Sequence, residues 1–365
     1  MTPDSLLNQD WADVVERLGG AEGLAQTASA SKAFLRPRVV RSASDLLRLV
    51  LAYCLGDGGL RLTAAWAAAI GLADLSNVAL LQRLRQCGDW LTMLVGQALA
   101  ASAPAASQGR LIRLLDATSV PQAGAAAKRG NKVWRIHSAF DLPAERFGSF
   151  VLTDHTESER LDRIAVVPGE IRIADRVYLH PEHIATVCDA GGDVIVRSGW
   201  KSARWCDAEG QTIDLIAVLR DTGQALIDQP IWLTRKQTAP LGLRLVAMRK
   251  SEQAAAAARR KARRDAQREG HTVSQATLLA ADWVLVVTSL DAATFTAADV
   301  LALYRLRWRI ELGFKRLKSV IGLHGPPGID ERSAKPYVLA HLLAILLLQP
   351  LIDALEDSPR CATAA

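Results

Sequence analysis

The spacing of hydrophobic residues changes near residue 105, and this change constrains the fold more than any other feature. Before it, apolar residues recur at helical spacing, as in LLRLVLAYCL, AAWAAAI and NVALLQRLRQ. The segment ASAPAASQ, residues 101–108, has the composition of a linker. After it the apolar runs are short and alternate as strands do. The sequence therefore predicts an all-α N-terminal domain over residues 1–105, followed by an α/β fold.

The helical region carries three candidate helix caps. They are Ser44 with Asp45, Thr63 and Ser76, each before an apolar run. The last two helices are joined by the short turn GLADLS, which is the layout of a helix-turn-helix. Its second helix would carry Asn77, Gln82, Arg83 and Arg85. A plain helical bundle shows the same pattern, so both interpretations stay open.

The region after residue 108 is predicted to form a mixed sheet. GRLIRLLDATSV is expected as a strand, KVWRIHSAFDL and RFGSFVLTDH as a hairpin, and SERLDRIAVV as a capped helix. IRIAD and DVIVRSG are expected strands on either side of the helix HPEHIATVCDAGG. WVLVVTSL then resumes the sheet, and Thr296 caps a helix predicted to run from Ala297 to Val320. Three antiparallel strands followed by alternating helix and strand indicate a ribonuclease-H-like sheet.

Residues 199–282 interrupt this sheet. They hold the runs TIDLIAVL, PIWLTR and LRLVAM, which are expected as short strands, and an alanine-rich basic helix. We therefore expect a ribonuclease-H-like domain over 106–198 plus 283–335, with a β-rich insertion over 199–282. A C-terminal packing helix and tail would occupy 336–365.

Positive charge is concentrated in the insertion. The net charge of +6 and the pI near 9.2 favour a polyanionic partner only mildly. The segment RKSEQAAAAARRKARRDAQR is far more basic, and it includes Arg259, Arg260, Arg263 and Arg264. A helix that tracks phosphates is the favoured interpretation, and a solvated surface helix is the alternative.

Other features disfavour several classes of protein. The five cysteines form no Cys-x-x-Cys pair and no zinc-ligand spacing with the seven histidines. The start, MTPDSLLNQDWADVVERL, lacks the basic end and apolar run of a secretory signal. The run YVLAHLLAILLLQPLIDAL contains His341, Gln349 and Pro350 and has no second apolar span beside it. We therefore expect a cytoplasmic protein with no membrane partner, in which this run is a buried helix.

Two aspartates are expected on buried strand faces. Asp116 shares a face with the apolar residues two and four positions before it, and Asp175 does the same in IRIAD. A buried carboxylate takes up a proton or meets a cation, because its isolated charge is costly. Either aspartate alone would more often cap a turn. Together, at the ends of neighbouring strands, they favour a site for hard divalent ions.

A third carboxylate lies in a predicted helix. In YRLRWRIELGFKRLK, the residues Tyr304, Arg307, Glu311 and Lys318 are spaced by three, four and seven positions. At about 100° per residue these side chains share one helical face, beside an apolar stripe. An Arg–Glu pair on a solvated helix is the alternative. The tyrosine and the many cations around one carboxylate favour a functional face.

Together these segments resemble a known family. The pattern Tyr-x2-Arg-x3-Glu-x6-Lys is complete, the first aspartate lies in DATSV, and the second lies in ADRVY. The sequence is similar to the DDE transposases of bacterial insertion sequences, in the family numbered four. The resemblance runs from FLRPRVVRSASDLLRLVLAYCLGDG to the C-terminal helix and includes the basic helix.

The resemblance implies a site, its cofactors and its partners. Asp116, Asp175 and Glu311 would be the catalytic, metal-binding triad and would hold two Mg²⁺ ions, for which Mn²⁺ can substitute. The residues expected to contact DNA are Tyr304, Arg307, Lys315 and Lys318, with Arg259, Arg260, Arg263 and Arg264 of the basic helix. The expected partners are double-stranded DNA with terminal inverted repeats, target DNA, and a second copy of the chain in a homodimer on paired ends. When bound to DNA the protein would associate with the nucleoid.

The implied reaction is cut-and-paste DNA transposition. Water would attack first and release a 3′ hydroxyl at the transposon end, and that hydroxyl would then attack another strand. Two alternatives stay open from the residues. One is a DNA-binding protein that keeps the basic surfaces but does not cut. The other is a ribonuclease-H-like nuclease without strand transfer.

Overall fold

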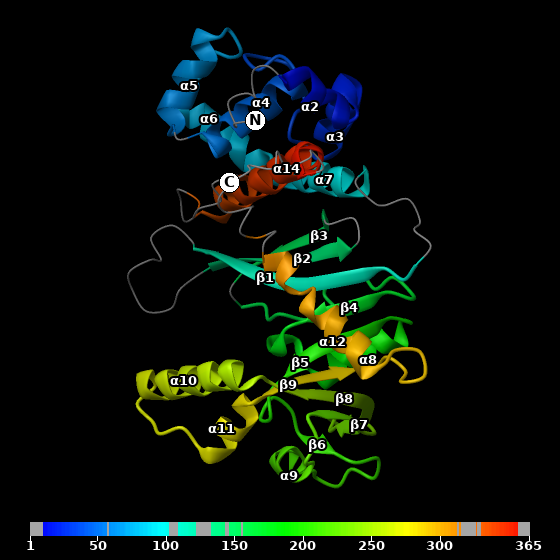
Figure 1. The fold of residues 1–365 in the computed structure, drawn as a ribbon. Helices are drawn as coiled ribbons and strands as arrows, with labels where there is room; N and C mark the ends of the chain where they lie inside the picture. Colours follow the sequence, from blue (N-terminus) through cyan, green and yellow to red (C-terminus); the bar gives the residue numbers. More distant parts are fainter. Residues whose placement is uncertain are drawn as a thin grey trace, which may run out of the picture.

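The computed structural model describes residues 10–56, 58–101, 109–121, 133–142, 146–154, 156–311, 314, 326 and 330–356. A layer of helices lies over one end of a large sheet, and the other end of the sheet extends away from this layer (Figure 1). The expected mixed α/β fold is confirmed.

The described residues from 10 to 101 hold helices and no strand. These are α2 (Trp11–Arg17), α3 (Gly20–Ala30), α4 (Ala43–Leu55), α5 (Leu60–Ala69), α6 (Asn77–Gln86) and α7 (Gly88–Ala101). Ser76 caps α6 as predicted, by accepting a hydrogen bond from the Ala79 N–H at 3.2 Å. Most of the predicted linker, residues 102–108, lies outside the described residues.

The other two expected caps are wrong. Ser42 caps α4 instead of Ser44, because its hydroxyl accepts a hydrogen bond from the Asp45 N–H at 3.0 Å. Thr63 lies inside α5, where its hydroxyl donates to the Gly59 carbonyl at 3.3 Å. A threonine in a helix interior satisfies its hydroxyl in this way, so its presence does not mark the start of a helix.

The C-terminal helix α14 (Glu331–Glu356) completes the helical layer. It packs against α4, α6 and α7, and each side chain from Val338 to Leu348 is at most 6% exposed. The prediction of a buried packing helix is confirmed for these residues. Within the described residues, no helix has both the length and the apolar character needed to span a membrane.

The sheet has one continuous strand order, β3-β2-β1-β4-β5-β9-β8-β7-β6. Its strands are β1 (Ile112–Pro121), β2 (Val133–Leu142), β3 (Arg146–Thr153), β4 (Ile171–Ala174), β5 (Asp193–Ser198), β6 (Trp205–Cys206), β7 (Leu226–Leu233), β8 (Leu241–Arg249) and β9 (Trp283–Thr288). The predicted β2–β3 hairpin is antiparallel, as is β1 with β2, whereas β4 runs parallel to both β1 and β5.

The insertion extends this sheet and does not form a second one. β9 pairs with β5 on one side and with β8 on the other, and β7 and β6 follow. TIDLIAVL was expected as a strand, and this is wrong, because it forms α9 (Leu215–Asp221). The Asp214 carboxylate caps α9 by accepting from the Ile216 N–H at 2.9 Å, and apolar residues at helical spacing are buried beneath it.

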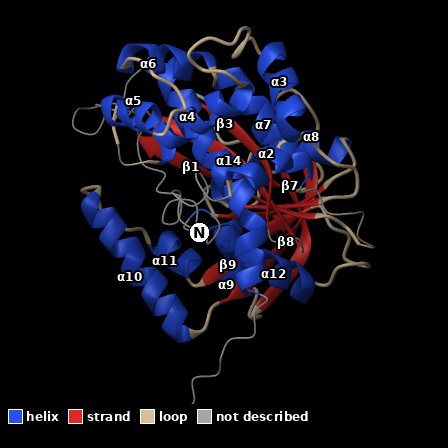
Figure 2. Cartoon of the chain, turned by 90° about the horizontal axis from the view of Figure 1, so that it is seen from above, coloured by secondary structure: helices blue, strands red, loops and turns tan. Residues whose placement is uncertain are grey.

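Helices cover both faces of the sheet (Figure 2). Leu114, Ile173 and Ile195 lie on the face that packs against α12 (Ala297–Arg305) and the helical layer. Leu115 and Ala174 lie on the opposite face, which packs against α8 (Pro181–Asp189), α9 and α11 (Gln275–Ala281). The basic helix α10 (Glu252–Arg268) lies beside α11.

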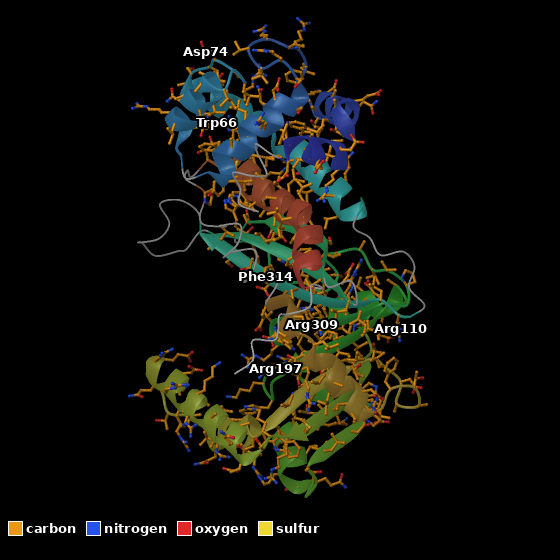
Figure 3. All side chains as sticks on the ribbon, turned by 45° about the horizontal axis from the view of Figure 1, so that its top comes forward. Trp66, Asp74, Arg110, Arg197, Arg309 and Phe314 are labelled. Atoms are coloured by element: carbon orange, nitrogen blue, oxygen red, sulfur yellow. The ribbon has the colours of Figure 1, made fainter. Side chains whose placement is uncertain are left out.

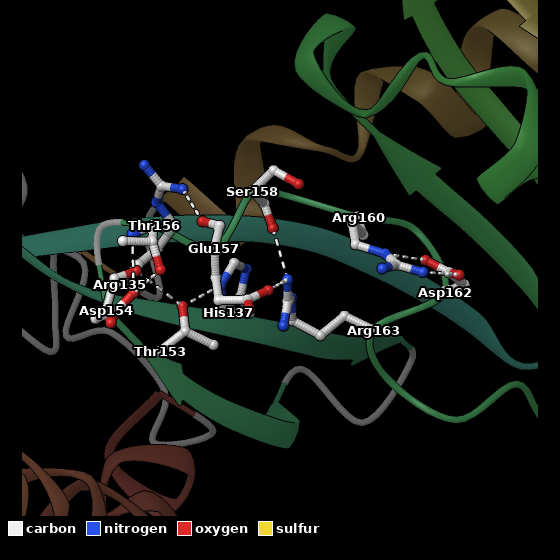
Figure 4. A network of polar contacts seen from close by, with 10 residues as sticks. All are labelled: Arg135, His137, Thr153, Asp154, Thr156, Glu157, Ser158, Arg160, Asp162 and Arg163. Carbon is white, nitrogen blue, oxygen red and sulfur yellow. Dashed lines mark hydrogen bonds and ion pairs between the residues drawn. The ribbon is translucent and has the colours of Figure 1, made fainter.

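SERLDRIAVV was expected as a helix, and this is wrong, because residues 158–167 form an irregular loop. The fully buried Arg172 donates to the carbonyls of Leu161 and Ala165 and pairs with Glu170 at 2.5 Å. These contacts hold the loop in its irregular form. Polar contacts also hold the start of the loop against β2 (Figure 4), where burial lowers the pKa of His137 to about 4.

The helix after Thr296 begins as predicted and ends early. Thr296 and Asp299 form a capping box, and α12 ends at Arg305, well before the expected Val320. Leu306 and Arg307 form a turn, and helical residues resume from Trp308 to Glu311. Most of the expected continuation, residues 315–320, lies outside the described residues.

Candidate active site

Asp116 and Asp175 occupy matching positions on neighbouring parallel strands. The last parallel pair of β1 and β4 joins Leu115 to Ala174, so the two aspartates come next, one strand spacing of about 4.8 Å apart. Their predicted face, shared with Leu114 and Ile173, is the face that packs against α12 and the helical layer. Both aspartates are half-buried.

Glu311 belongs to a segment that packs on the same face of the sheet as the two aspartates. Ile310 and Phe314, on either side of it, are buried in the core that contains Leu114. The Phe314 ring lies 5.7 Å from the Phe147 ring of β3, which fixes this segment above the sheet. Figure 3 marks the region with Phe314, Arg309 and Arg197. The side chain of Glu311 itself is exposed.

The three carboxylates lie within electrostatic range of one another. Burial raises the pKa of Asp116, and the charges of Asp175 and Glu311 raise it further. The Ala117 N–H, which donates to Asp116 at 2.8 Å, and the guanidinium of Arg307 oppose this rise in pKa. Asp116 is therefore repelled by both other carboxylates, and a cation would relieve that repulsion.

The carboxylate oxygens of Asp116, Asp175 and Glu311 suit a hard divalent cation. Oδ1 of Asp175 is buried and accepts no hydrogen bond from the residues that the structure describes, and it lies 3.9 Å from the guanidinium of Arg197. Carboxylate oxygens are the ligands that Mg²⁺ and Ca²⁺ prefer. Within the described residues, no three acidic, histidine or cysteine side chains are close enough to hold an ion as they stand. Glu311 instead accepts a hydrogen bond from Arg307 at 2.6 Å.

Tyr304 lies beside the acidic cluster. Its hydroxyl is buried near the guanidinium of Arg307, and burial raises the pKa of the hydroxyl, whereas the charge of Arg307 lowers it. Together with Arg307 it brings two of the predicted DNA contacts to this site. Lys315 and Lys318, the other two predicted contacts of this segment, lie outside the described residues.

A cleft of about 530 Å³ adjoins Asp175, and the sequence did not predict it. Its lining is rich in cations, namely Arg176, Arg197, Lys201, Lys250 and Lys261, with Asp175 and Asp265 as the acids. Arg197 could have been found from its strand, because it lies two residues after Ile195 on the face of the aspartates. The others come from separate segments that only the fold brings together.

The arginines of the basic helix α10 fall into two groups, one bound in ion pairs and the other exposed. Arg259 pairs with Asp282 at 2.6 Å and with Glu252 at 2.5 Å, so its predicted contact with DNA would require it to leave these carboxylates. Arg260, Arg263 and Arg264 are exposed and form no ion pair with any described residue. These three keep the features expected of phosphate contacts.

In the predicted helix-turn-helix segment, the second helix α6 carries Asn77, Gln82, Arg83 and Arg85 as expected. Arg85 pairs with Asp330 at 2.8 Å and donates to the Ser333 hydroxyl at 3.1 Å, which holds α6 to the start of α14. Gln82 remains exposed, and Asn77 and Arg83 are half-buried.

A mixed sheet that carries these carboxylates beside a cationic cleft suits a protein that binds a phosphate backbone. Residues 107–347, more than half of the chain, match the family model described as the transposase DDE domain. The chain belongs to the DDE transposase family. It is a DNA transposase, a metal-dependent enzyme that cuts DNA and transfers strands.

Named relatives support the same conclusion over nearly the full length. The chain is 37% identical to the "Putative transposase InsL for insertion sequence element IS186A" of Escherichia coli (strain K12), with 97% of both chains covered. It is also 37% identical to the "Transposase for insertion sequence element IS421" of Escherichia coli, again with 97% of both chains covered. The resemblance recognised in the sequence is confirmed.

Proposed function

We propose that this transposase cleaves and joins DNA at the ends of an insertion sequence, with Asp116, Asp175 and Glu311 as its metal-binding catalytic residues. The observation that carries the assignment is the position of Asp116, whose pKa is raised by burial and by the charges of both other carboxylates. The names of the relatives, which are transposases of insertion sequence elements, support the choice of DNA substrate.

A ribonuclease-H-like fold would explain why Asp116, Asp175 and Glu311 belong to segments on one face of the sheet. The order β3-β2-β1-β4-β5, with three antiparallel strands followed by two parallel ones, supports that assignment. In such a sheet the ends of β1 and β4 lie side by side, and a helix that packs on one face can add a third carboxylate. We also assign α14 to the same structural unit as the N-terminal helices, because it packs against α4, α6 and α7.

The proposed cofactors are two Mg²⁺ ions, for which Mn²⁺ would substitute. Such ions activate an oxygen nucleophile and neutralise the leaving oxygen of a phosphodiester. Asp116 would help to hold both ions, because the charges of Asp175 and Glu311 both act on its carboxylate. Asp175 would use the buried oxygen that has no partner, and Glu311 would complete the site after it releases Arg307.

DNA would follow the cations that surround this acidic cluster. The cleft beside Asp175 carries more basic than acidic side chains, which suits a phosphate backbone. Tyr304, Arg307, Lys315 and Lys318 would contact phosphates near the cleaved bond. The helical layer, either as a helix-turn-helix or as a plain bundle, would bind the terminal inverted repeats. A homodimer on paired ends, capture of target DNA and association with the nucleoid complete the proposal.

The experiment is incubation of the protein with labelled duplexes that carry the inverted repeats flanking its gene. With Mg²⁺ we expect cleavage that leaves a 3′ hydroxyl, followed by joined products, and with EDTA we expect neither. Binding without cleavage would support a DNA-binding protein that does not cut. Cleavage without joined products would support a nuclease without strand transfer.

The exposed arginines of α10 provide a second test. Replacing Arg260, Arg263 and Arg264 together by glutamine should weaken DNA binding and lower the log-log salt slope by about three units, since each phosphate contact adds roughly one. The slope is measured from gel-shift affinities over a series of salt concentrations. An unchanged slope would show that this face of α10 is a solvated surface that does not contact DNA.

Arg259→Gln is the matched control on the same helix. It removes an equal charge, but its guanidinium is already bound by Asp282 and Glu252. We expect it to leave the salt slope unchanged.

A further inference from the structure

The carboxylate of Glu311 is already paired with a cation from its own segment. Nη2 of Arg307 donates to Oε1 of Glu311 at 2.6 Å, a charge-assisted hydrogen bond. The Arg307 side chain is 17% exposed and the Glu311 side chain is 56% exposed, so the pair reaches from the edge of the core to the surface. A divalent cation that bound Glu311 would therefore compete with this guanidinium for the carboxylate.

Arg307 sits at an irregular point of the backbone. After α12 ends, the N–H groups of Leu306, Arg307 and Ile310 each donate to the carbonyl three residues earlier, at 3.0 to 3.3 Å. A tighter stretch between helical segments often marks a functional hinge. The Arg307 side chain can thus be redirected without breaking a regular α-helix.

Arg307 lies within range of the charges of Asp116 and Asp175, but its hydrogen bond is to Glu311. DNA would offer it a further anion, a phosphate attracted by the neighbouring cationic cleft. An arginine binds carboxylate and phosphate with the same donor geometry, so exchange between them needs no change in its chemistry.

We propose that Arg307 is an exchangeable counter-ion of Glu311 and that this exchange couples DNA binding to metal binding. The inference rests on the proposed function, in which Glu311 is a metal ligand. A phosphate that draws Arg307 away frees Glu311 for the metal ion, and a metal ion on Glu311 frees Arg307 for DNA. By linkage, each ligand raises the affinity for the other by the same factor. Arg307 is in this sense a positioning residue.

The test measures DNA affinity with and without a metal ion that serves as a probe. Fluorescence anisotropy of a labelled end duplex gives the Kd in EDTA and in Ca²⁺ at matched ionic strength. We expect the ratio of the two values to be about tenfold larger for the wild type than for Arg307→Met, a size typical of coupled sites. Direct contact between metal and phosphate contributes to the ratio in every variant, so only the difference reports on Arg307.

Two further variants make the comparison specific. Arg305→Met removes the same charge from an exposed residue that has no ion pair with the described residues, and it should keep the wild-type ratio. Arg307→Lys keeps a cation beside Glu311 and should restore part of the ratio. Without DNA, Arg307→Met should bind Mn²⁺ more tightly than Arg305→Met, because the competitor for Glu311 is gone. Thermal melting shows whether each variant is folded.

The outcomes separate this inference from the proposed function. If Arg307→Met keeps the wild-type ratio while Glu311→Gln loses it, the coupling role is wrong and Glu311 remains a metal ligand. If both variants keep the ratio, Glu311 is not a metal ligand, and both proposals are overturned.

Discussion

Replacing Asp116 by asparagine should abolish Mg²⁺-dependent cleavage of the transposon end, with a loss of several orders of magnitude. The amide keeps the size of the side chain but removes the charge shared between the proposed metal ions. DNA binding should survive or tighten slightly, since a negative charge near the phosphates is lost. The measurement pairs gel-shift affinity with nicking of the same duplex.

Asp265→Asn is the control for this result. Asp265 lines the cleft beside Asp175 from α10, so the substitution removes an equal charge near the site without touching the proposed triad. We expect its cleavage rate to stay within a few-fold of the wild-type rate. Wild-type nicking by Asp116→Asn, or an equal loss in both variants, would contradict the assignment of Asp116 as a metal ligand.

Replacing Arg172 by methionine should lower the free energy of unfolding by about 3 to 5 kcal/mol, the size expected when one partner of a buried ion pair is removed. Arg172 and Glu170 are both fully buried and 2.5 Å apart. The substitution also leaves the carbonyls of Leu161 and Ala165 without their donor. Urea unfolding of the wild type and the variant gives the difference.

Two comparisons test the cause of this loss. Arg160→Met breaks an ion pair with Asp162 in the same loop, but Arg160 is 44% exposed, and the cost should stay within about 1 kcal/mol. In Arg172→Met the Glu170 carboxylate keeps its ion pair with Arg113 at 3.1 Å, so the double variant Glu170→Gln/Arg172→Met, which breaks that pair as well, should be no more stable than Arg172→Met alone. Equal costs for Arg160→Met and Arg172→Met would show that burial of the pair does not matter.

Much of the fold could be predicted because its signals are local. Strand alternation located β1 to β5 and β9, and it placed Asp116 and Asp175 on the face that packs against α12. Ser76 and Thr296 were recognised as caps because a cap bonds to backbone within three residues of itself. These interactions depend on neighbours in the chain, which the sequence displays directly.

The errors in the fold arise where a partner outside the segment overrides the local pattern. The loop at 158–167 has a helical pattern, but Arg172 binds two of its carbonyls and holds it in an irregular form. Other contacts cannot be read from the sequence. Arg259 resembles its neighbours on α10 but pairs with Asp282 and Glu252, and Arg85 pairs with Asp330, which is 245 positions away.

The sequence by itself determined the class of fold, the three candidate carboxylates and the family, because periodicity and motif spacing are properties of adjacent residues. Only the tertiary structure decided which charges are free. It united the cations of the cleft beside Asp175 from separate segments, and it paired Glu311 with Arg307. The physical reason is that electrostatic and hydrogen-bond energies depend on distance in space, and that distance is set by how the strands and helices pack.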